Sequence, residues 1–281
     1  MDIELQIELQ KNKKIEPYIG RKFVDKINRI ALDAGQKILD IYSQDFAVFE
    51  KTDQSPLTEA DLASHGHILE QLTVLTPQVP ILSEESTDIS WQERRLWDCY
   101  WLVDPLDGTK EFIKRNGEFT VNIALIYQGL PVLGVVYAPV LGVLYFATAA
   151  IGAWKQFKSE PALVIKAVRA KSGSTNKNES HVMKVMGSRS HPSEQLNAYL
   201  EQLGRHQVEV MGSSLKICYL AEGKADLYPR LGPTCEWDTA AAHAVLKYAG
   251  GHCVNYETGE ELVYNTKDSL LNPFFIAEVQ R

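Results

Sequence analysis

Apolar residues recur every three or four positions along two stretches near the start of the chain, a spacing that places them on one face of an α-helix. In the first stretch they are Phe23, Ile27, Ile30, Ala34, Ile38 and Ile41. The second stretch starts at Thr58, where TEAD offers a capping hydroxyl and, three residues later, an acid. It continues through Leu62, Ile68, Leu72 and Leu75. The pattern predicts two helices ahead of the first strands.

Short apolar segments follow, and their length and composition are typical of strands. They begin at Val79, Cys99, Phe119, Pro131 and Gly142. No charged residue occurs from Phe119 to Trp154, which raises the alternative of a membrane span. Glycine and proline break this stretch into pieces of about eight residues, too short to cross a bilayer as helices. Successive buried strands are therefore predicted.

The second half of the chain alternates strand-like and helix-like segments. The predicted strands are VMKVMGS, QVEVMGS and ADLYPRL, and the predicted helices cover about Ser193 to Leu203, a stretch through Ile217 and Leu220, and Glu236 to Ala249. This alternation is typical of an α/β architecture. The polar segment KSGSTNKNES, Lys171 to Ser180, is predicted to be a flexible surface loop near the boundary between the halves.

The predicted organisation has three parts. Residues 1–20 form an N-terminal extension, residues 21–160 an α+β half, and residues 161–281 an α/β half. In the extension, Ile3, Leu5, Ile7 and Leu9 alternate with polar residues, which indicates a strand or a loosely held segment. We expect it to act in oligomerisation or local packing, and a homo-oligomer stays an open outcome.

Composition narrows the class of partner. The 281 residues are 45% hydrophobic and 23% charged, with a net charge of −7 and no basic stripe, so a nucleic-acid polymer is not expected to bind. The four cysteines stand far apart without a CxxC pair, which argues against a zinc knuckle or a disulfide framework. Without a secretory signal or a transmembrane segment, we predict a cytoplasmic protein; peripheral attachment to the inner face of the cell membrane stays open.

Acidic residues occur at three distant points, each at the end of a strand candidate or the start of a helix. They are Glu84 and Glu85 in ILSEES, Asp104 and Asp107 in LVDPLDGT, and Asp238 in CEWDTAAA. A turn explains any one of them. Gathered carboxylates repel one another and are costly to desolvate, so a folded protein usually neutralises them with a cation. Oxygen ligands of this kind suit magnesium, manganese or calcium.

The peptide after Asp107 adds a phosphate site to this hypothesis. Gly108 permits close backbone approach, and Thr109 to Ile113 can begin a helix whose free N–H groups face an anion. Two divalent ions about 4 Å apart can stabilise both the attacking and the leaving oxygen of an in-line displacement. Haloacid dehalogenase phosphatases carry DxDGT with a nucleophilic first aspartate, but here two residues separate the aspartates. We therefore predict phosphate ester hydrolysis by activated water.

The motif DPLDGT, with SEES upstream and EWDTAAAHAVLKYAGG downstream, resembles the inositol monophosphatase superfamily of magnesium-dependent, lithium-sensitive phosphatases. The resemblance extends from about Phe23 to Ile276. Within the superfamily, DPLDGTKEF, DQSPLTEAD, GSRSH and GSSLK look most like the bacterial 3'(2'),5'-bisphosphate nucleotidases. The resemblance implies a mixed α+β and α/β fold, a layered αβαβα sandwich.

The resemblance also implies a set of site residues. Two or three Mg²⁺ ions would be held by Glu84, Asp104, the carbonyl of Leu106, Asp107 and Asp238. Thr109 would orient the attacking water, and Glu84 or Asp53 would help to take its proton; the alternative role of Asp53 is to form the turn before Pro56. The implied substrate-binding residues are Glu84, Asp107, Gly108, Thr109, Lys110, Ser188, His191, Ser213, Lys216, Arg230 and Asp238. The resemblance thus implies metal-binding motifs in residues 21–160, and substrate-binding residues with the last metal ligand in residues 161–281.

A cation at Arg230 favours a doubly phosphorylated substrate, because inositol-processing relatives tend to carry an acid near this place. The alternative interpretation of Arg230 is an ordinary solvated charge on a loop. Ser214 and Arg189 could face the same cleft. The histidines at 65, 67 and 243 are expected to serve packing or to lie on the surface.

These expectations combine into a functional prediction. The chain is predicted to be a magnesium-dependent phosphomonoesterase that removes the 3'-phosphate of adenosine 3',5'-bisphosphate, leaving AMP, with action on the sulfated analogue left open. An inositol or fructose bisphosphate phosphatase on the same scaffold is the first alternative. A non-catalytic metal- or nucleotide-binding module is the second, and a protein whose acids only form turns is the third.

Overall fold

The computed structural model describes residues 13–50, 56–86, 88–168, 182–188 and 194–279. Its helices are α2 (Glu16–Ile19), α3 (Arg21–Tyr42), α4 (Glu59–Leu75), α5 (Trp91–Arg94), α6 (Thr109–Ile113), α7 (Glu194–Gln202), α8 (Leu215–Ala221) and α9 (Ala240–Ala249). The first strands are β1 (Val48–Glu50), β2 (Pro56–Thr58), β3 (Ile81–Ser83), β4 (Cys99–Asp107), β5 (Thr120–Tyr127), β6 (Leu130–Ala138) and β7 (Val143–Thr148). The later strands are β8 (Gly152–Phe157), β9 (Leu163–Val164), β10 (Met183–Ser188), β11 (His206–Met211), β12 (Leu227–Arg230), β13 (His252–Asn255) and β14 (Phe275–Glu278).

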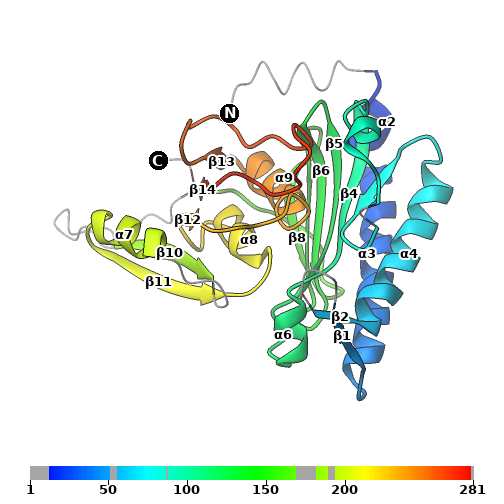
Figure 1. The fold of residues 1–281 in the computed structure, drawn as a ribbon, viewed down its shortest axis with the longest axis horizontal. Coiled ribbons are helices and arrows are strands. Elements are labelled where there is room, and N and C mark those ends of the chain that lie inside the picture. Colours follow the sequence, from blue (N-terminus) through cyan, green and yellow to red (C-terminus); the bar gives the residue numbers. More distant parts are fainter. Residues whose placement is uncertain (1–12, 51–55, 87, 169–181, 189–193, 280–281) are drawn as a thin grey trace.

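The two helices predicted first, α3 and α4, lie side by side on one face of the larger sheet (Figure 1). The buried face of α3 includes Ile27, Ile30, Ala34 and Ile38, as the periodicity predicts. Helix α4 begins after Thr58, whose side chain accepts a hydrogen bond from backbone, while the carboxylate of Asp61 accepts from the Thr58 N–H. Both helices and the capping box are confirmed.

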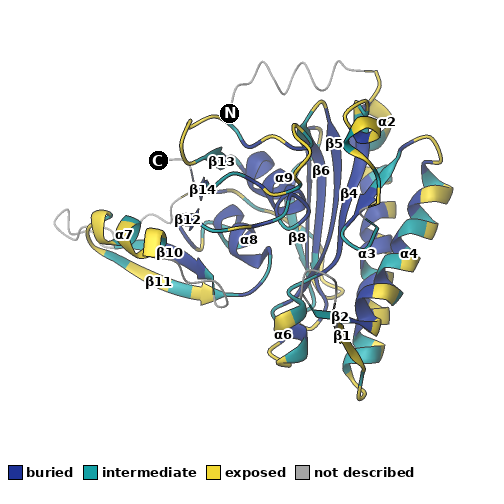
Figure 2. Cartoon of the chain, in the orientation of Figure 1, coloured by how far each residue is buried: buried dark blue, intermediate teal, exposed yellow. Residues whose placement is uncertain are grey.

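The larger sheet has seven strands in the order β3-β4-β5-β6-β7-β8-β9. Only β3 and β4 pair in parallel, and every later neighbour is antiparallel. The uncharged stretch that raised the membrane alternative forms β5, β6 and β7, and every residue of β5 is buried. Figure 2 shows this buried sheet between the outer helices and the rest of the fold. The prediction of buried strands is confirmed.

Helix α9 covers the opposite face of this sheet (Figure 1). Gly134 of β6 permits the contact, because a Cβ atom there would lie 2.2 Å from the carbonyl oxygen of Ala241. Beyond α8 and α9 stands the second sheet, ordered β11-β10-β12-β14-β13, with β10 parallel to β11 and β12. Helix, sheet, helix, sheet and helix thus follow in layers, which confirms the expected αβαβα arrangement.

Several boundaries differ from the sequence-based expectation. The prediction that two helices precede every strand is wrong, since β1 and β2 pair between α3 and α4. Strands β8, β9, β13 and β14 were not anticipated. Helix α9 starts at Ala240 and not at Glu236, because residues 237–239 form a turn in which the Thr239 N–H donates to the Glu236 carbonyl. That turn places Asp238 outside the helix.

The predicted extension is described only from residue 13 onward. Ile15 and Ile19 are fully or almost fully buried and belong to the main core, so this end of the extension takes part in packing. The alternating stretch 3–9 and the predicted loop 171–180 lie outside the described residues. Among the described residues, every helix is too short or too polar to span a lipid bilayer.

Candidate active site

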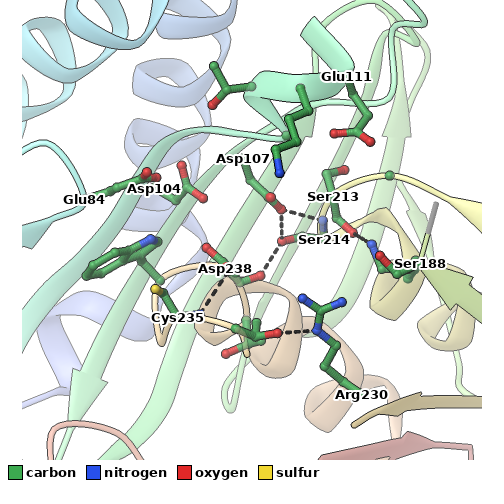
Figure 3. Close-up of a pocket in the computed structure, with 18 of the residues that line it drawn as sticks. Glu84, Asp104, Asp107, Glu111, Ser188, Ser213, Ser214, Arg230, Cys235 and Asp238 are labelled. Carbon is green, nitrogen blue, oxygen red and sulfur yellow. Dashed lines mark hydrogen bonds between the residues drawn. The ribbon is translucent and has the colours of Figure 1, made fainter. Parts of the chain in front are cut away.

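A pocket of about 620 Å³ opens where the end of β4 meets the segments that lead into α8 and α9. It brings together residues that are far apart in the sequence, drawn in Figure 3. The predicted site residues among its lining are Glu84, Asp104, Leu106, Asp107, Gly108, Thr109, Lys110, Ser188, Ser213, Lys216, Arg230 and Asp238. Every predicted site residue that the structure describes therefore lines one pocket.

An irregularity in β4 puts both of its aspartates into this pocket. Side chains three residues apart in a regular strand point to opposite faces of the sheet. The pairing of β4 with β5 shifts register between Asp104 and Asp107, which is the effect of a β-bulge. Carboxylate oxygens of Asp104, Asp107 and Asp238 consequently lie within 4.8 Å of one another.

The other two acids reach the same place from turns. Asp238 stands in the turn before α9, where its Oδ2 accepts a hydrogen bond of 3.1 Å from the backbone N–H of Cys235. Glu84 follows β3, and Figure 3 shows its side chain beside Asp104. All four predicted carboxylate ligands are thus brought together.

Burial makes this cluster electrostatically unfavourable without a cation. Desolvation, reinforced by Glu84, raises the pKa of Asp104 well above its ordinary value. Desolvation, together with Asp107 and Glu84, does the same to the pKa of Asp238. Burial also raises the pKa of Asp107, but Lys216 and hydrogen bonds from Ser214 counteract that rise.

The donor set fits a hard divalent cation. Asp104 is 1% exposed, and its Oδ2 atom is buried without a hydrogen-bond partner among the described residues. Its Oδ1 atom accepts a hydrogen bond of 3.0 Å from the Leu106 N–H. An orphaned carboxylate oxygen next to two further carboxylates is the environment that an oxygen-coordinated cation would satisfy.

Gly108 and Thr109 turn the chain from β4 into α6. Gly108 has φ 96°, a left-handed conformation that favours glycine and explains its place in the motif. The Thr109 hydroxyl donates a hydrogen bond of 3.3 Å to Oδ1 of Asp61. Sequence reasoning assigned Asp61 to the α4 cap alone, although the aspartate is almost fully buried and contacts the pocket-lining threonine. The TEAD motif identified Asp61 as a capping residue, but nothing in the sequence indicated its hydrogen bond with Thr109.

Cationic and hydroxyl groups line the other side of the pocket. Lys216 is buried, its Nζ donates a hydrogen bond of 2.5 Å to the Ser213 carbonyl, and it lies 5.4 Å from the centre of the Tyr228 ring. Burial lowers the pKa of Lys216 to about 8, while Asp107 opposes that shift. Arg230 is also buried; it donates to the Thr234 hydroxyl and to a nearby backbone carbonyl.

The remaining candidates separate into three groups. Asp53, Arg189 and His191 lie outside the described residues. Lys110 is exposed and Ser188 half-buried, and both line the pocket. Ser214 also lines it, but its N–H and hydroxyl donate to Asp107.

The three histidines named in the sequence analysis lie in helices, His65 and His67 in α4 and His243 in α9, and none of them lines the pocket. His243 is fully buried in α9, where its Nδ1 lies 2.9 Å from the Tyr264 hydroxyl, so it serves packing as expected. The Nδ1 atom of His65 in α4 lies 3.0 Å from the Ser83 hydroxyl.

Comparison with known proteins assigns the family. The sequence model of the inositol monophosphatase family matches residues 21–279. The 3'(2'),5'-bisphosphate nucleotidase CysQ of Salmonella typhimurium is 50% identical over 254 residues, 90% of this chain and 98% of the relative. The protein of the same name from Escherichia coli K12 is 50% identical over 255 residues, with the same coverage.

Solved structures agree with the sequence comparison. CysQ from Bacteroides thetaiotaomicron, described as a bacterial member of the inositol monophosphatase family, has a TM-score of 0.78 and 42% identity. That match covers 92% of this chain and 97% of the other. An IMPase of Thermotoga maritima shares the fold with a TM-score of 0.71 and 23% identity. The chain belongs to the inositol monophosphatase family, as its motifs indicated.

Proposed function

We propose that this protein is a magnesium-dependent 3'(2'),5'-bisphosphate nucleotidase that removes the 3'-phosphate of adenosine 3',5'-bisphosphate to give AMP and phosphate. The observation that carries the proposal is the composition of one pocket, in which Asp104, Asp107 and Asp238 face Lys216 and Arg230. A metal-assisted site and a site for a second phosphate therefore adjoin. The two CysQ relatives at 50% identity support this choice of substrate.

Glu84, Asp104, Asp107 and Asp238, with the carbonyl of Leu106, are proposed to hold two or three Mg²⁺ ions. Bound divalent ions lower the pKa of a water molecule and stabilise negative charge that develops on phosphate oxygens. The role of the protein is to gather the carboxylates in a buried place, where their mutual repulsion favours cation binding. The orphaned Oδ2 atom of Asp104 is consistent with that role.

Thr109 is proposed to orient the attacking water. Its hydroxyl donates to Asp61, so the lone pairs of its oxygen remain available to accept a hydrogen bond from water. The carboxylate of Asp61 is itself fixed, because its Oδ2 accepts from the Thr58 N–H at 2.8 Å. Glu84 is proposed to help take the proton of the water, and Asp53 keeps its proposed supporting role on sequence grounds alone.

The substrate is proposed to lie with its scissile phosphate near Asp107, Gly108, Thr109 and Lys110. Its second phosphate would meet Lys216 and Arg230, two buried cations whose charges are weakly screened by solvent. Ser188 and Ser213 supply hydroxyl groups to the same pocket. An arginine suits this place because its planar guanidinium can form two hydrogen bonds to one phosphate.

A substrate panel tests the proposal. Purified protein with Mg²⁺ is expected to release phosphate from adenosine 3',5'-bisphosphate, with AMP as the only nucleotide product. The second phosphate is absent from 3'-AMP. The kcat/KM for 3'-AMP is therefore expected to be lower by about 10-fold or more, which is the contribution of one charge-assisted contact. Rapid hydrolysis of inositol 1-phosphate with no release from the bisphosphate would contradict the substrate assignment. Absence of Mg²⁺-dependent hydrolysis on every phosphate monoester would contradict the enzymatic proposal.

A further inference from the structure

Ser214 stands immediately before α8, a position at which a serine usually caps a helix. Its hydroxyl would then accept a hydrogen bond from an N–H of the first helical turn. The Ser214 side chain makes no such bond. The residue is 3% exposed, so the hydroxyl is not directed at bulk solvent either. Its partners must therefore explain why a serine stands there.

Those partners belong to the acidic cluster. The Ser214 N–H donates to Oδ2 of Asp107 at 2.6 Å, and the Ser214 hydroxyl lies 2.8 Å from the same oxygen (Figure 3). The amide of Asn122, on the neighbouring strand β5, donates to the Ser214 hydroxyl at 2.8 Å and lies 3.4 Å from Oδ2 of Asp107. Donors thus converge on one oxygen of Asp107 and fix the rotation of its carboxylate.

The same hydroxyl reaches the segment that carries a second acid of the cluster. Ser214 Oγ lies 2.6 Å from the backbone carbonyl oxygen of Asp238. The single proton of the Ser214 hydroxyl lies between two acceptors, Oδ2 of Asp107 and the carbonyl oxygen of Asp238. The hydroxyl oxygen in turn accepts the hydrogen bond from Asn122. Ser214 consequently joins the end of β4, strand β5 and the turn before α9 at one atom.

We propose that Ser214, held in place by Asn122, is a positioning residue that sets the geometry of the metal ligands Asp107 and Asp238. The inference rests on the proposed function in one respect, that this acidic cluster binds a divalent cation. Oδ2 of Asp107 accepts hydrogen bonds from the protein, which leaves the other carboxylate oxygen available to a cation. Groups that orient metal ligands typically alter metal affinity by about 10- to 100-fold when removed.

Ser214→Ala tests the inference by metal binding in the absence of substrate. Mn²⁺ affinity of the full chain is measured by calorimetry, and the Mg²⁺ concentration for half-maximal activity is measured separately. Thr148→Val is the matched control, because Thr148 is fully buried and its hydroxyl also donates to a backbone carbonyl, that of Ile19 at 2.7 Å, away from the acidic cluster. We expect Ser214→Ala to weaken Mn²⁺ binding by about 10-fold or more, and the control to change it less than about twofold.

Kinetics separate a positioning role from substrate binding. Ser214→Ala should raise the half-saturating Mg²⁺ concentration, whereas the KM for adenosine 3',5'-bisphosphate at saturating Mg²⁺ should stay within about twofold of wild type. Mn²⁺ affinity of Ser214→Ala within twofold of wild type overturns the inference. An equal loss in Thr148→Val also overturns it, since the effect would then report general destabilisation.

Asn122→Ala provides a second test if Ser214→Ala does not fold. Weakening of Mn²⁺ binding beyond twofold supports the inference, and affinity within twofold of wild type overturns it. Failure of the proposed function and failure of the positioning role of Ser214 give different results. Wild-type protein that binds neither Mn²⁺ nor Mg²⁺ contradicts the proposed function and this inference together, whereas normal wild-type binding with unaltered variants contradicts this inference alone.

Discussion

The two sheets that meet at the pocket differ in burial and in the charge that they contribute. Strand β4 of the larger sheet is buried from Tyr100 to Leu106 and supplies Asp104 and Asp107. The second sheet supplies Arg230, and its outer layer is much less buried: α7 has no buried residue, and β11 has no fully buried position. Asp104 and Asp107 therefore stand on the well-packed sheet, whereas Arg230 stands on β12, a buried strand of the sheet whose far edge is exposed.

This difference assigns separate tasks to the two sheets. Ligands for a cation need fixed positions, and a strand buried on both faces supplies them. Arg230 is itself buried on β12, but the outer elements of its sheet, α7 and β11, have few buried contacts, and such regions open at lower free energy. We therefore expect substitutions on β4 to affect kcat most strongly, and substitutions among the cations to affect KM.

The largest effect is expected for Asp107→Asn. The change removes a negative charge from the proposed metal ligands while preserving shape, and it should lower kcat/KM by more than about 100-fold, the upper range for residues that only orient a ligand. Thermal unfolding should show a fold as stable as wild type or more so, because the substitution relieves repulsion among buried carboxylates. Steady-state kinetics with Mg²⁺ and circular dichroism measure the two quantities.

Asp98→Asn is the matched control for that substitution. Asp98 undergoes the same chemical change, but its side chain is 62% exposed and pairs with Lys14 on the surface. We expect its kinetics to equal those of wild type. Near-normal turnover by Asp107→Asn would remove the basis for assigning the chemistry to the larger sheet.

Much of the larger sheet could be predicted from the sequence. Runs of β-branched and aromatic residues without charge identify buried strands, and the capping box at Thr58 identifies a helix start from four consecutive residues. Short or amphipathic strands were harder to predict from the sequence. Strand β9 has two residues, and β13 and β14 have only four each, so their periodicity is too brief to distinguish from a loop.

The acidic residues of the site were predictable as a set, but their contacts were not. Asp104 and Asp107 carry a recognisable motif, whereas the bulge that turns both into one pocket depends on pairing with β5. The bond between Thr109 and Asp61 joins residues 48 positions apart in the sequence. Ser214 lines the pocket that it was expected to face, but the sequence did not indicate that its hydroxyl lies against Asp107, 107 positions away. Such contacts depend on how the layers pack, which one sequence alone does not specify.

A smaller effect is expected from the ionisation of Lys216. Burial lowers its pKa to about 8, so the side chain is charged below that pH and loses its proton as the pH rises through it. The phosphates of the substrate are already ionised there, since their second pKa is about 6. The KM for adenosine 3',5'-bisphosphate should therefore increase by about 10-fold between pH 7 and pH 9.5.

Lys216→Arg separates this lysine from other titrating groups. Arginine stays charged throughout that range, so the rise in KM with pH should disappear in the variant. Lys37→Arg is the control, because Lys37 is exposed on α3, and it should keep the wild-type profile. A pH profile of KM that is identical in wild type and Lys216→Arg would show that Lys216 does not contact the second phosphate.

The last expected effect is on local stability and not on activity, and hydrogen exchange of the whole protein measures it. Amide protons of α7 and β11 should exchange at least about 10-fold faster than those of β5 and β6, a difference of about 1.4 kcal/mol in opening free energy. Val208 and Val210 of β11 are 41% and 46% exposed, whereas β5 is buried throughout.

Helix α9 belongs to the second half of the chain but packs on the larger sheet. All of its residues are buried, so its amides should exchange as slowly as those of β5 and β6. Fast exchange in α9 together with α7 would mean that local stability follows the halves of the sequence. Slow exchange in α9 with fast exchange in α7 would mean that it follows burial, so that Asp238, in the turn before α9, shares the rigidity of the larger sheet while Ser188, at the end of β10, does not.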